Sequence, residues 1–149
     1  MPNINNLGNV LIRSDLNVPI KNGEITDYYR ILKSVEIAKK ISDKSRTITF
    51  VSHLGRPDGK DLKLSLRPVA NKMSEILDKE VHFIEETYGE KVERQIETSE
   101  SKIFLLENLR YEKGEIDNDK NFSKQITKPF DSYIFDAFGA AHREHASVV

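Results

Sequence analysis

Arginine follows four of the short apolar stretches of this 149-residue chain, at Arg13, Arg56, Arg110 and Arg143. The chain has 15 lysines against 8 arginines, yet no lysine occurs in the short stretches that hold these four arginines, which are residues 13–17, 52–57, 107–110 and 136–145. A guanidinium group is a planar fork of donors that fits phosphate and carboxylate, whereas an ammonium group is a point charge. Several arginines on one face would repel one another without an anion between them. The pattern therefore predicts a basic pocket for a small anionic ligand, with a phosphorylated ligand favoured.

Each arginine taken alone has a simpler interpretation. A loop arginine is usually solvated or paired with a nearby carboxylate, and we assign Arg46, Arg67 and Arg94 to that class. Arg30, in the first turn of the first expected helix, would alone be a helix-face charge that pairs with Asp27. Arginine after four of five expected strands is what favours a shared anion site.

Polar residues beside these arginines leave two interpretations open. Asp15 and Asn17 share a loop with Arg13, where their side chains could cap their own backbone, a common use in turns. The same side chains could equally contact hydroxyl groups of a substrate. His53 could be a ligand contact or a satisfied loop histidine. His82 lies inside an apolar stretch and is expected to be structural.

Motifs for metals or nucleotide phosphates are incomplete in this sequence. His142 and His145 have a spacing that could suggest zinc, but the chain has no cysteine and no clear carboxylate partner for them. Residues 55–60 are one residue short of a phosphate-binding P-loop and lack its Ser or Thr. Residues 117–122 begin like a calcium loop, but Phe122 occupies the position that needs glycine. We therefore expect no metal site and no nucleotide site within this chain.

Five short apolar runs, rich in β-branched and aromatic residues, are too short for helices and predict strands. They lack clean alternation, which is typical of strands buried on both faces of a sheet. The runs are residues 10–12, 48–51, 81–84, 103–106 and 133–135.

Segments with helical periodicity lie between these runs, at residues 28–42, 66–77, 89–98 and 118–127. Ser65 is the expected N-cap of the second helix, and Pro68 is tolerable in its first turn. The alternation predicts an α/β fold: a Rossmann-like, three-layer αβα sandwich with a parallel sheet. Ligands of such sheets bind at the carboxyl ends of the strands, where the arginine-bearing loops begin.

Composition narrows the class of protein. The length suits about one domain, and the net charge of −1 gives no reason to expect nucleic acid or an anionic membrane as partner. The first residues lack the basic start and apolar run of a signal peptide. The longest apolar runs are far below the roughly 20 residues that span a bilayer. We expect a soluble, cytoplasmic protein.

The same stretches resemble the phosphoglycerate kinase family. Residues 13–19 match its R-x-D-x-N-x-P signature and residues 52–57 its S-H-L-G-R-P, while residues 25–31 are similar to the family's segment between them. Residues 105–111 match L-L-E-N-L-R-F with Tyr for Phe, and residues 136–145 resemble D-A-F-G-T-A-H-R-A-H. The departures are Leu16 for Phe, Ala140 for Thr and Glu144 for Ala; none removes an anion-binding side chain.

This resemblance implies that residues 1–149 are an N-terminal phosphoglycerate kinase domain, truncated before the interdomain helix. The family transfers a phosphoryl group between 1,3-bisphosphoglycerate and ADP, giving 3-phosphoglycerate and ATP in glycolysis. The resemblance implies that Mg-ATP or Mg-ADP binds the missing C-terminal domain, and that this chain binds no cofactor. We expect a monomer that is inactive alone. A standalone module that binds phosphorylated acids without kinase activity, and a domain that serves only as an interaction surface, are the alternatives.

The resemblance also assigns roles to individual residues. Asp15 and Asn17 would contact the glycerate end of the substrate. The 3-phosphate would be held by His53 and the loop arginines, and Arg30 would be catalytic by stabilising the phosphoryl group in flight. The full set implied for substrate binding is Arg13, Asp15, Leu16, Asn17, Arg30, His53, Leu54, Gly55, Arg56, Arg110 and Arg143.

Overall fold

The computed structural model describes residues 7–22, 24–52, 65–108 and 120–136. Within them lies a five-stranded sheet in the order β5-β6-β4-β1-β7, with every neighbouring pair parallel. All five predicted strands are confirmed, and the structure extends three of them by several residues. The strands are β1 (Gly8–Ser14), β4 (Ser45–Val51), β5 (Val81–Ile84), β6 (Ile103–Leu106) and β7 (Ser132–Asp136).

The central strands are buried on both faces, as the unbroken apolar runs predict. Val10, Leu11 and Ile12 of β1 have no exposed surface, and all four residues of β6 are buried. β1 lies between β4 and β7, with Val10 opposite Ile48 on one side and Ser132 on the other. Two neighbours and two covered faces leave β1 no contact with solvent along its centre.

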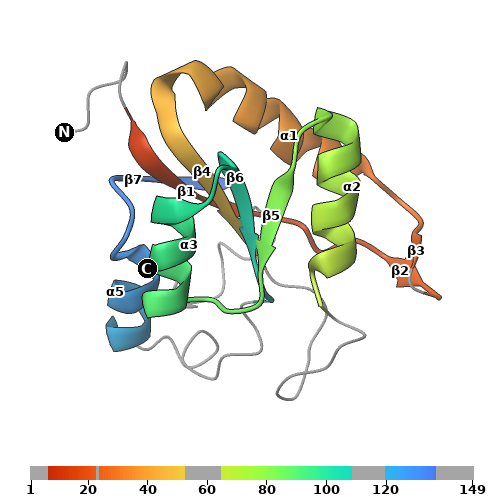
Figure 1. Ribbon diagram of the computed structural model, residues 1–149. Coiled ribbons are helices and arrows are strands. Elements are labelled where there is room, and N and C mark those ends of the chain that lie inside the picture. The colour runs from red at the N-terminus through yellow and green to blue at the C-terminus, as the bar shows by residue number, and fades with distance from the viewer. Residues whose placement is uncertain (1–6, 23, 53–64, 109–119, 137–149) are drawn as a thin grey trace.

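In the described part of the chain, helices cover both faces of the sheet, as Figure 1 shows. One apolar cluster joins α1 and α2 to the side chains of Val10, Ile12 and Phe50, and a second joins α3 and α5 to those of Leu11 and Phe104. The predicted three-layer αβα sandwich is therefore confirmed. The helices are α1 (Tyr29–Ile41), α2 (Arg67–Leu77), α3 (Glu90–Thr98) and α5 (Lys120–Thr127).

The start of α2 differs from the sequence prediction. Its N-cap is Leu66 rather than Ser65, and no side chain of the N-cap residue itself caps the helix. The Ser65 hydroxyl still accepts a hydrogen bond from the Arg67 backbone N–H at 3.2 Å. The prediction is wrong by one residue because a carboxylate from another element, described below, bonds to the helix start.

Short elements outside the sheet were not predicted. β2 (Ile20–Lys21) and β3 (Glu24–Ile25) form a two-stranded antiparallel sheet, and η1 (Ser42–Lys44) is a 3₁₀ turn after α1. None of the helices in the described part of the chain combines the length and apolar character that crossing a bilayer requires.

Candidate functional site

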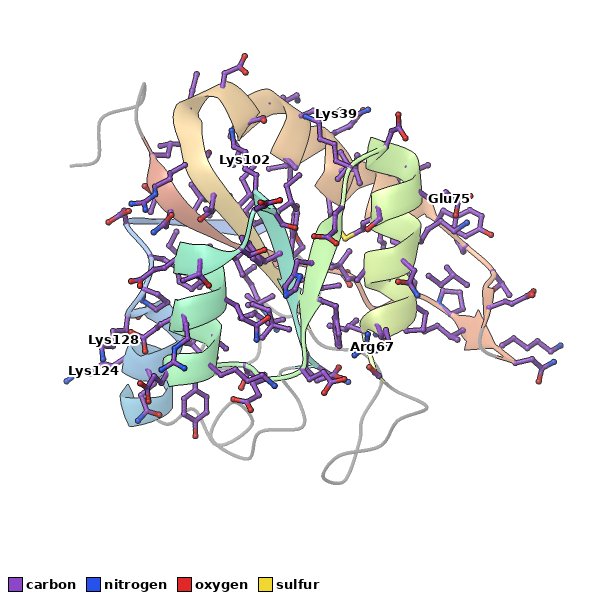
Figure 2. All side chains as sticks on the ribbon, viewed as in Figure 1. Lys39, Arg67, Glu75, Lys102, Lys124 and Lys128 are labelled. Atoms are coloured by element: carbon purple, nitrogen blue, oxygen red, sulfur yellow. The ribbon has the colours of Figure 1, made fainter. Side chains whose placement is uncertain are left out.

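The strand order places a topological switch point between β4 and β6. The connection from β4 passes through α2 on one face of the sheet, and that from β6 passes through α5 on the other. Loops that leave neighbouring strands in opposite directions open a ligand-binding crevice at their carboxyl ends. Ser52 follows β4 directly and Glu107 follows β6 directly. Figure 2 shows Arg67, at the start of α2, near this edge, with Lys39 and Lys102 at the opposite one.

Arg13 lies near the end of β1 with no exposed surface. A buried charge is costly unless neighbouring groups compensate for it, and Arg13 does interact with other residues. The side chain is thus built into the sheet edge rather than displayed on the surface. It can contribute positive charge to a site at this edge.

Asp15 and Asn17 form a turn directly after β1. The Asp15 Oδ1 atom accepts a hydrogen bond from the Asn17 backbone N–H at 3.2 Å, the local capping that such residues often provide. The first of the two interpretations of Asp15 is therefore realised. It leaves contact with a ligand open, because a carboxylate has acceptor positions for several donors.

Arg30 joins this turn from the first turn of α1. Its Nη1 atom donates to Asp15 Oδ1 at 3.3 Å and to the Asn17 carbonyl oxygen at 2.5 Å. The simpler alternative for Arg30, a pair with Asp27, is not the contact described; Asp27 Oδ1 accepts the Tyr29 backbone N–H at 3.0 Å. The Arg30 side chain is 48% exposed, so a ligand can reach it. Nε and Nη2 carry three further N–H donors.

Leu16, between the two polar turn residues, is fixed by β4. Its backbone N–H donates to the Ser52 Oγ atom at 2.9 Å, and both residues are fully buried. Ser52 therefore connects the end of β4 to the loop after β1. Sequence reasoning placed Ser52 in a motif but did not give its side chain a role.

Glu107 is the site-edge residue that sequence reasoning missed. Its side chain is buried, and its Oε1 atom accepts the backbone N–H groups of Leu66 at 3.0 Å and Asn108 at 2.8 Å. Its Oε2 atom accepts the Ser65 hydroxyl at 2.8 Å. We call these contacts the Glu107 bridge. The available signal was a charged residue directly after a fully apolar strand, which must find partners when buried.

The described residues bring together Arg13, Asp15, Leu16, Asn17 and Arg30 at the carboxyl edge. The remaining predicted site residues lie outside the described part of the chain, and their placement stays a prediction. They are His53, Leu54, Gly55, Arg56, Arg110 and Arg143. His142, His145 and residues 55–60 lie outside it as well.

Arg67, Arg94 and His82, which the sequence assigned to structural roles, make structural contacts. Arg67 forms an ion pair with Glu85, and its guanidinium lies 4.7 Å from the centre of the Phe83 ring. Arg94 pairs with Glu90 at 3.1 Å, one helical turn away. His82 is half-buried in β5 and makes a 2.6 Å hydrogen bond with the Gln95 side chain.

Hollows away from this edge are poorly suited to an anion. A cavity of about 610 Å³ beside α3 and α5 is lined by three glutamates with Arg94 and Lys128, and Lys128 lies 3.7 Å from Glu93. Another, of about 400 Å³, is lined by Glu24, Glu75 and Lys72. There the hydrogen bond to Glu75 raises the pKa of Lys72, and partial burial opposes that rise. In both hollows the cations are matched or outnumbered by carboxylates. Within the described residues, no three metal-ligating side chains come together.

The described residues thus define an α/β protein that carries Arg13, Arg30 and the Asp15–Asn17 turn at the carboxyl edge of a parallel sheet. The sequence model of the family described as phosphoglycerate kinase matches residues 4–149. The chain belongs to the phosphoglycerate kinase family.

Individual relatives agree with this membership. The chain is 47% identical over 141 residues to a phosphoglycerate kinase of Wolbachia pipientis, covering 94% of this chain and 36% of the relative. It is 48% identical over 139 residues to that of Dictyoglomus turgidum, covering 93% and 35%. The chain therefore spans about a third of the length of the curated relatives it matches.

Solved structures show the same fold. The phosphoglycerate kinase of Coxiella burnetii superposes with a TM-score of 0.79 at 38% identity, over 98% of this chain and 36% of that one. The enzyme of Pyrococcus horikoshii superposes with a TM-score of 0.80 at 29% identity, over 97% and 38%.

Proposed function

We propose that residues 1–149 form the N-terminal, 3-phosphoglycerate-binding domain of a phosphoglycerate kinase. In this proposal the complete enzyme transfers a phosphoryl group reversibly between 1,3-bisphosphoglycerate and ADP. Magnesium-bound nucleotide is held by a second domain outside residues 1–149. The proposed protein is a cytoplasmic monomer whose partners are small molecules, with neither nucleic acid nor membrane among them.

The observation that carries the proposal is the convergence of Arg13, Arg30 and the Asp15–Asn17 turn on one sheet edge. Arg13 comes from β1, the turn follows that strand directly, and Arg30 of α1 donates to the turn through Nη1. The sequence attaches Arg56 and Arg110 to the loops that leave β4 and β6, the two strands that flank the crevice. An anionic substrate at this edge would explain why arginine occurs in each of these segments.

The proposed chemistry needs orientation and charge rather than a protein base. A carboxylate oxygen of 3-phosphoglycerate is already ionised at neutral pH and can attack the terminal phosphorus of ATP directly. An acyl phosphate forms, and ADP leaves. Transfers of this kind are catalysed by positioning and by stabilising charge on the transferred group.

Arg30 fits the role of stabilising the phosphoryl group. Two of its donor contacts fix Nη1 on the turn, and the planar guanidinium thereby holds Nε and Nη2 in a defined direction. Asp15 and Asn17, beside it, would contact the glycerate hydroxyl and carboxylate end. Arg56, Arg110, Arg143 and His53 would hold the 3-phosphate.

Thermal unfolding with and without 3-phosphoglycerate tests the proposal. A ligand that binds the native state adds RT ln(1 + [L]/Kd), about 2.7 kcal/mol at 100 times Kd. We expect an upward shift of Tm at millimolar ligand. Arg56→Ala should remove most of this shift, whereas the matched variant Arg94→Ala, whose guanidinium pairs with Glu90 on α3, should keep it. No shift in the unsubstituted chain would count against substrate binding.

A coupled assay tests the remainder of the proposal. This chain alone should show no phosphoryl transfer from ATP to 3-phosphoglycerate, because the nucleotide domain is missing. The same assay on the chain extended by the rest of a family member's sequence should show transfer. Turnover by the 149-residue chain alone would contradict the assignment of the nucleotide site to another domain.

A further inference from the structure

The Glu107 bridge connects two segments that carry arginines, and the proposed function assigns these arginines to phosphate binding. Glu107 directly follows β6, and Asn108, whose backbone N–H it accepts, precedes Arg110 by two residues. A chain of that length spans at most about 7 Å between Cα atoms. On the other side, Ser65 and Leu66 end the stretch that contains His53 and Arg56. One carboxylate thus holds the start of one such segment and the end of the other.

The contacts are those of a fixed, ionised acceptor. Glu107 accepts three hydrogen bonds with donor–acceptor distances from 2.8 to 3.0 Å, and its side chain is only 4% exposed. Both oxygens act as acceptors, which an ionised carboxylate does. The start of α2 adds a favourable field, since helix N-termini stabilise negative charge. Buried hydrogen bonds to a charged group are stronger and more directional than neutral ones.

The other end of the 53–64 stretch has a matching anchor. Ser52 precedes it and is buried, and its hydroxyl accepts the Leu16 backbone N–H. The stretch therefore leaves the sheet from a residue bonded to the Asp15–Asn17 turn and returns at a residue bonded to Glu107. The Glu107 side chain links the end of this stretch to the segment leading to Arg110.

We infer that Glu107 is a positioning residue for the substrate phosphate, because it holds the end of one arginine-bearing segment, at Ser65 and Leu66, against the start of the other, at Asn108. This inference rests on the proposed function. Glu107 touches no substrate in this account; it acts on Arg56 and Arg110 through the backbone at Leu66 and Asn108.

Binding of 3-phosphoglycerate, measured by isothermal titration calorimetry on the folded 149-residue chain, tests the inference. Glu107→Ala removes all three acceptor contacts, and we expect its Kd to rise about tenfold or more. Glu107→Gln keeps an acceptor for the two backbone N–H groups but places a donor opposite the Ser65 hydroxyl. Its Kd should rise by a smaller factor, about threefold, so the conservative variant rescues part of the loss.

Two controls separate positioning from stability. Glu85→Ala deletes an exposed glutamate that pairs with Arg67 at the start of the same helix. Met73→Ala weakens the core under α2, where Met73 is fully buried. Both controls should leave Kd unchanged, although Met73→Ala lowers the urea midpoint of unfolding. A parallel measurement of amide hydrogen exchange should show faster exchange at Leu66 and Asn108 in Glu107→Ala but not in Glu85→Ala.

The outcomes are distinguishable. A Kd for Glu107→Ala equal to that of Met73→Ala would overturn the inference and leave the proposed function standing. If Glu107→Ala fails to fold, the Kd of Glu107→Gln is compared with that of Glu85→Ala. A higher Kd for Glu107→Gln supports positioning, and an equal Kd overturns it. If the unsubstituted chain binds no 3-phosphoglycerate at millimolar concentration, the proposed function fails and the inference fails with it.

Discussion

The hydrogen bond between Leu16 and Ser52 offers a test of how the site loop is held. Ser52→Ala removes the hydroxyl that accepts the Leu16 backbone N–H at 2.9 Å, at a place where both residues are fully buried. Water cannot easily replace the lost acceptor there, and an unsatisfied buried N–H costs about 1–3 kcal/mol. We expect the free energy of unfolding to fall by that amount. The substitution deletes one atom, so a cavity adds little.

Urea unfolding followed by circular dichroism measures this effect, with Ser99→Ala as the matched control. The Ser99 hydroxyl also accepts a backbone N–H, that of Ser101 at 3.2 Å, but the pair lies only partly buried beyond α3. Water can take the place of that hydroxyl, so the control should lose less than about 1 kcal/mol. Each kilocalorie corresponds to about 2–4 °C in Tm for a chain near this size.

Ligand binding extends the same test. Loosening Leu16 should loosen Asp15 and Asn17 on either side of it, so Ser52→Ala should also raise the Kd for 3-phosphoglycerate, while Ser99→Ala should not. Equal losses of stability in the two variants would refute the reasoning that burial makes the Ser52 contact important.

Three further predictions address the turn, the core and the sheet. Arg30→Ala should change the free energy of unfolding by less than about 1 kcal/mol, because its ion pair is exposed. The same variant should raise the Kd for 3-phosphoglycerate tenfold or more, measured by calorimetry. An unchanged Kd would remove Arg30 from the site. Met73→Ala should destabilise the chain by about 2–5 kcal/mol in urea, as deletions in a packed core do; a loss below 1 kcal/mol would contradict its complete burial. Gly8→Ala should lower the free energy of unfolding by about 2 kcal/mol or more, since Gly8 has a φ of +67° and an added Cβ would overlap the Asp131 carboxylate. An unchanged urea midpoint would contradict this prediction.

Local patterns predicted the architecture because they report burial. The runs at Val10–Ile12 and Ile103–Leu106 are apolar without alternation, and the structure buries both on two faces. Helical periodicity likewise predicted a helix over residues 89–98, and the structure buries Val92 and Ile96 of α3. Such signals lie within a few residues of one another, so a single sequence carries them completely.

Long-range partners escaped the prediction for a physical reason. Ser65 was expected to cap α2, but Glu107, 41 residues beyond Leu66, bonds to the helix start. Local spacing offered Asp27, three residues earlier, as a partner for Arg30 taken alone, but Arg30 bonds to Asp15 and the Asn17 carbonyl. Neither choice is written in local spacing, because each depends on which strands become neighbours. The β2–β3 pair was missed because two-residue strands have no periodicity to detect.

The candidate site also combines features that the sequence predicted with features that depend on long-range packing. Position after the first strand placed Arg13, Asp15 and Asn17 near one edge, the family resemblance added Arg30, and the structure brings these residues there. Sequence could not show that Arg13 would be completely buried or that Ser52 and Glu107 would hold the loops. These properties arise from packing between elements that are far apart along the chain.

A crystal structure of this chain with bound 3-phosphoglycerate tests the central claim most directly. Our account predicts the phosphate at the carboxyl edge of the sheet, contacted by the guanidinium groups of Arg56, Arg110 and Arg143, with the glycerate end toward Asp15 and Asn17. A phosphate bound elsewhere, or arginines that point to different faces around an empty crevice, would contradict it.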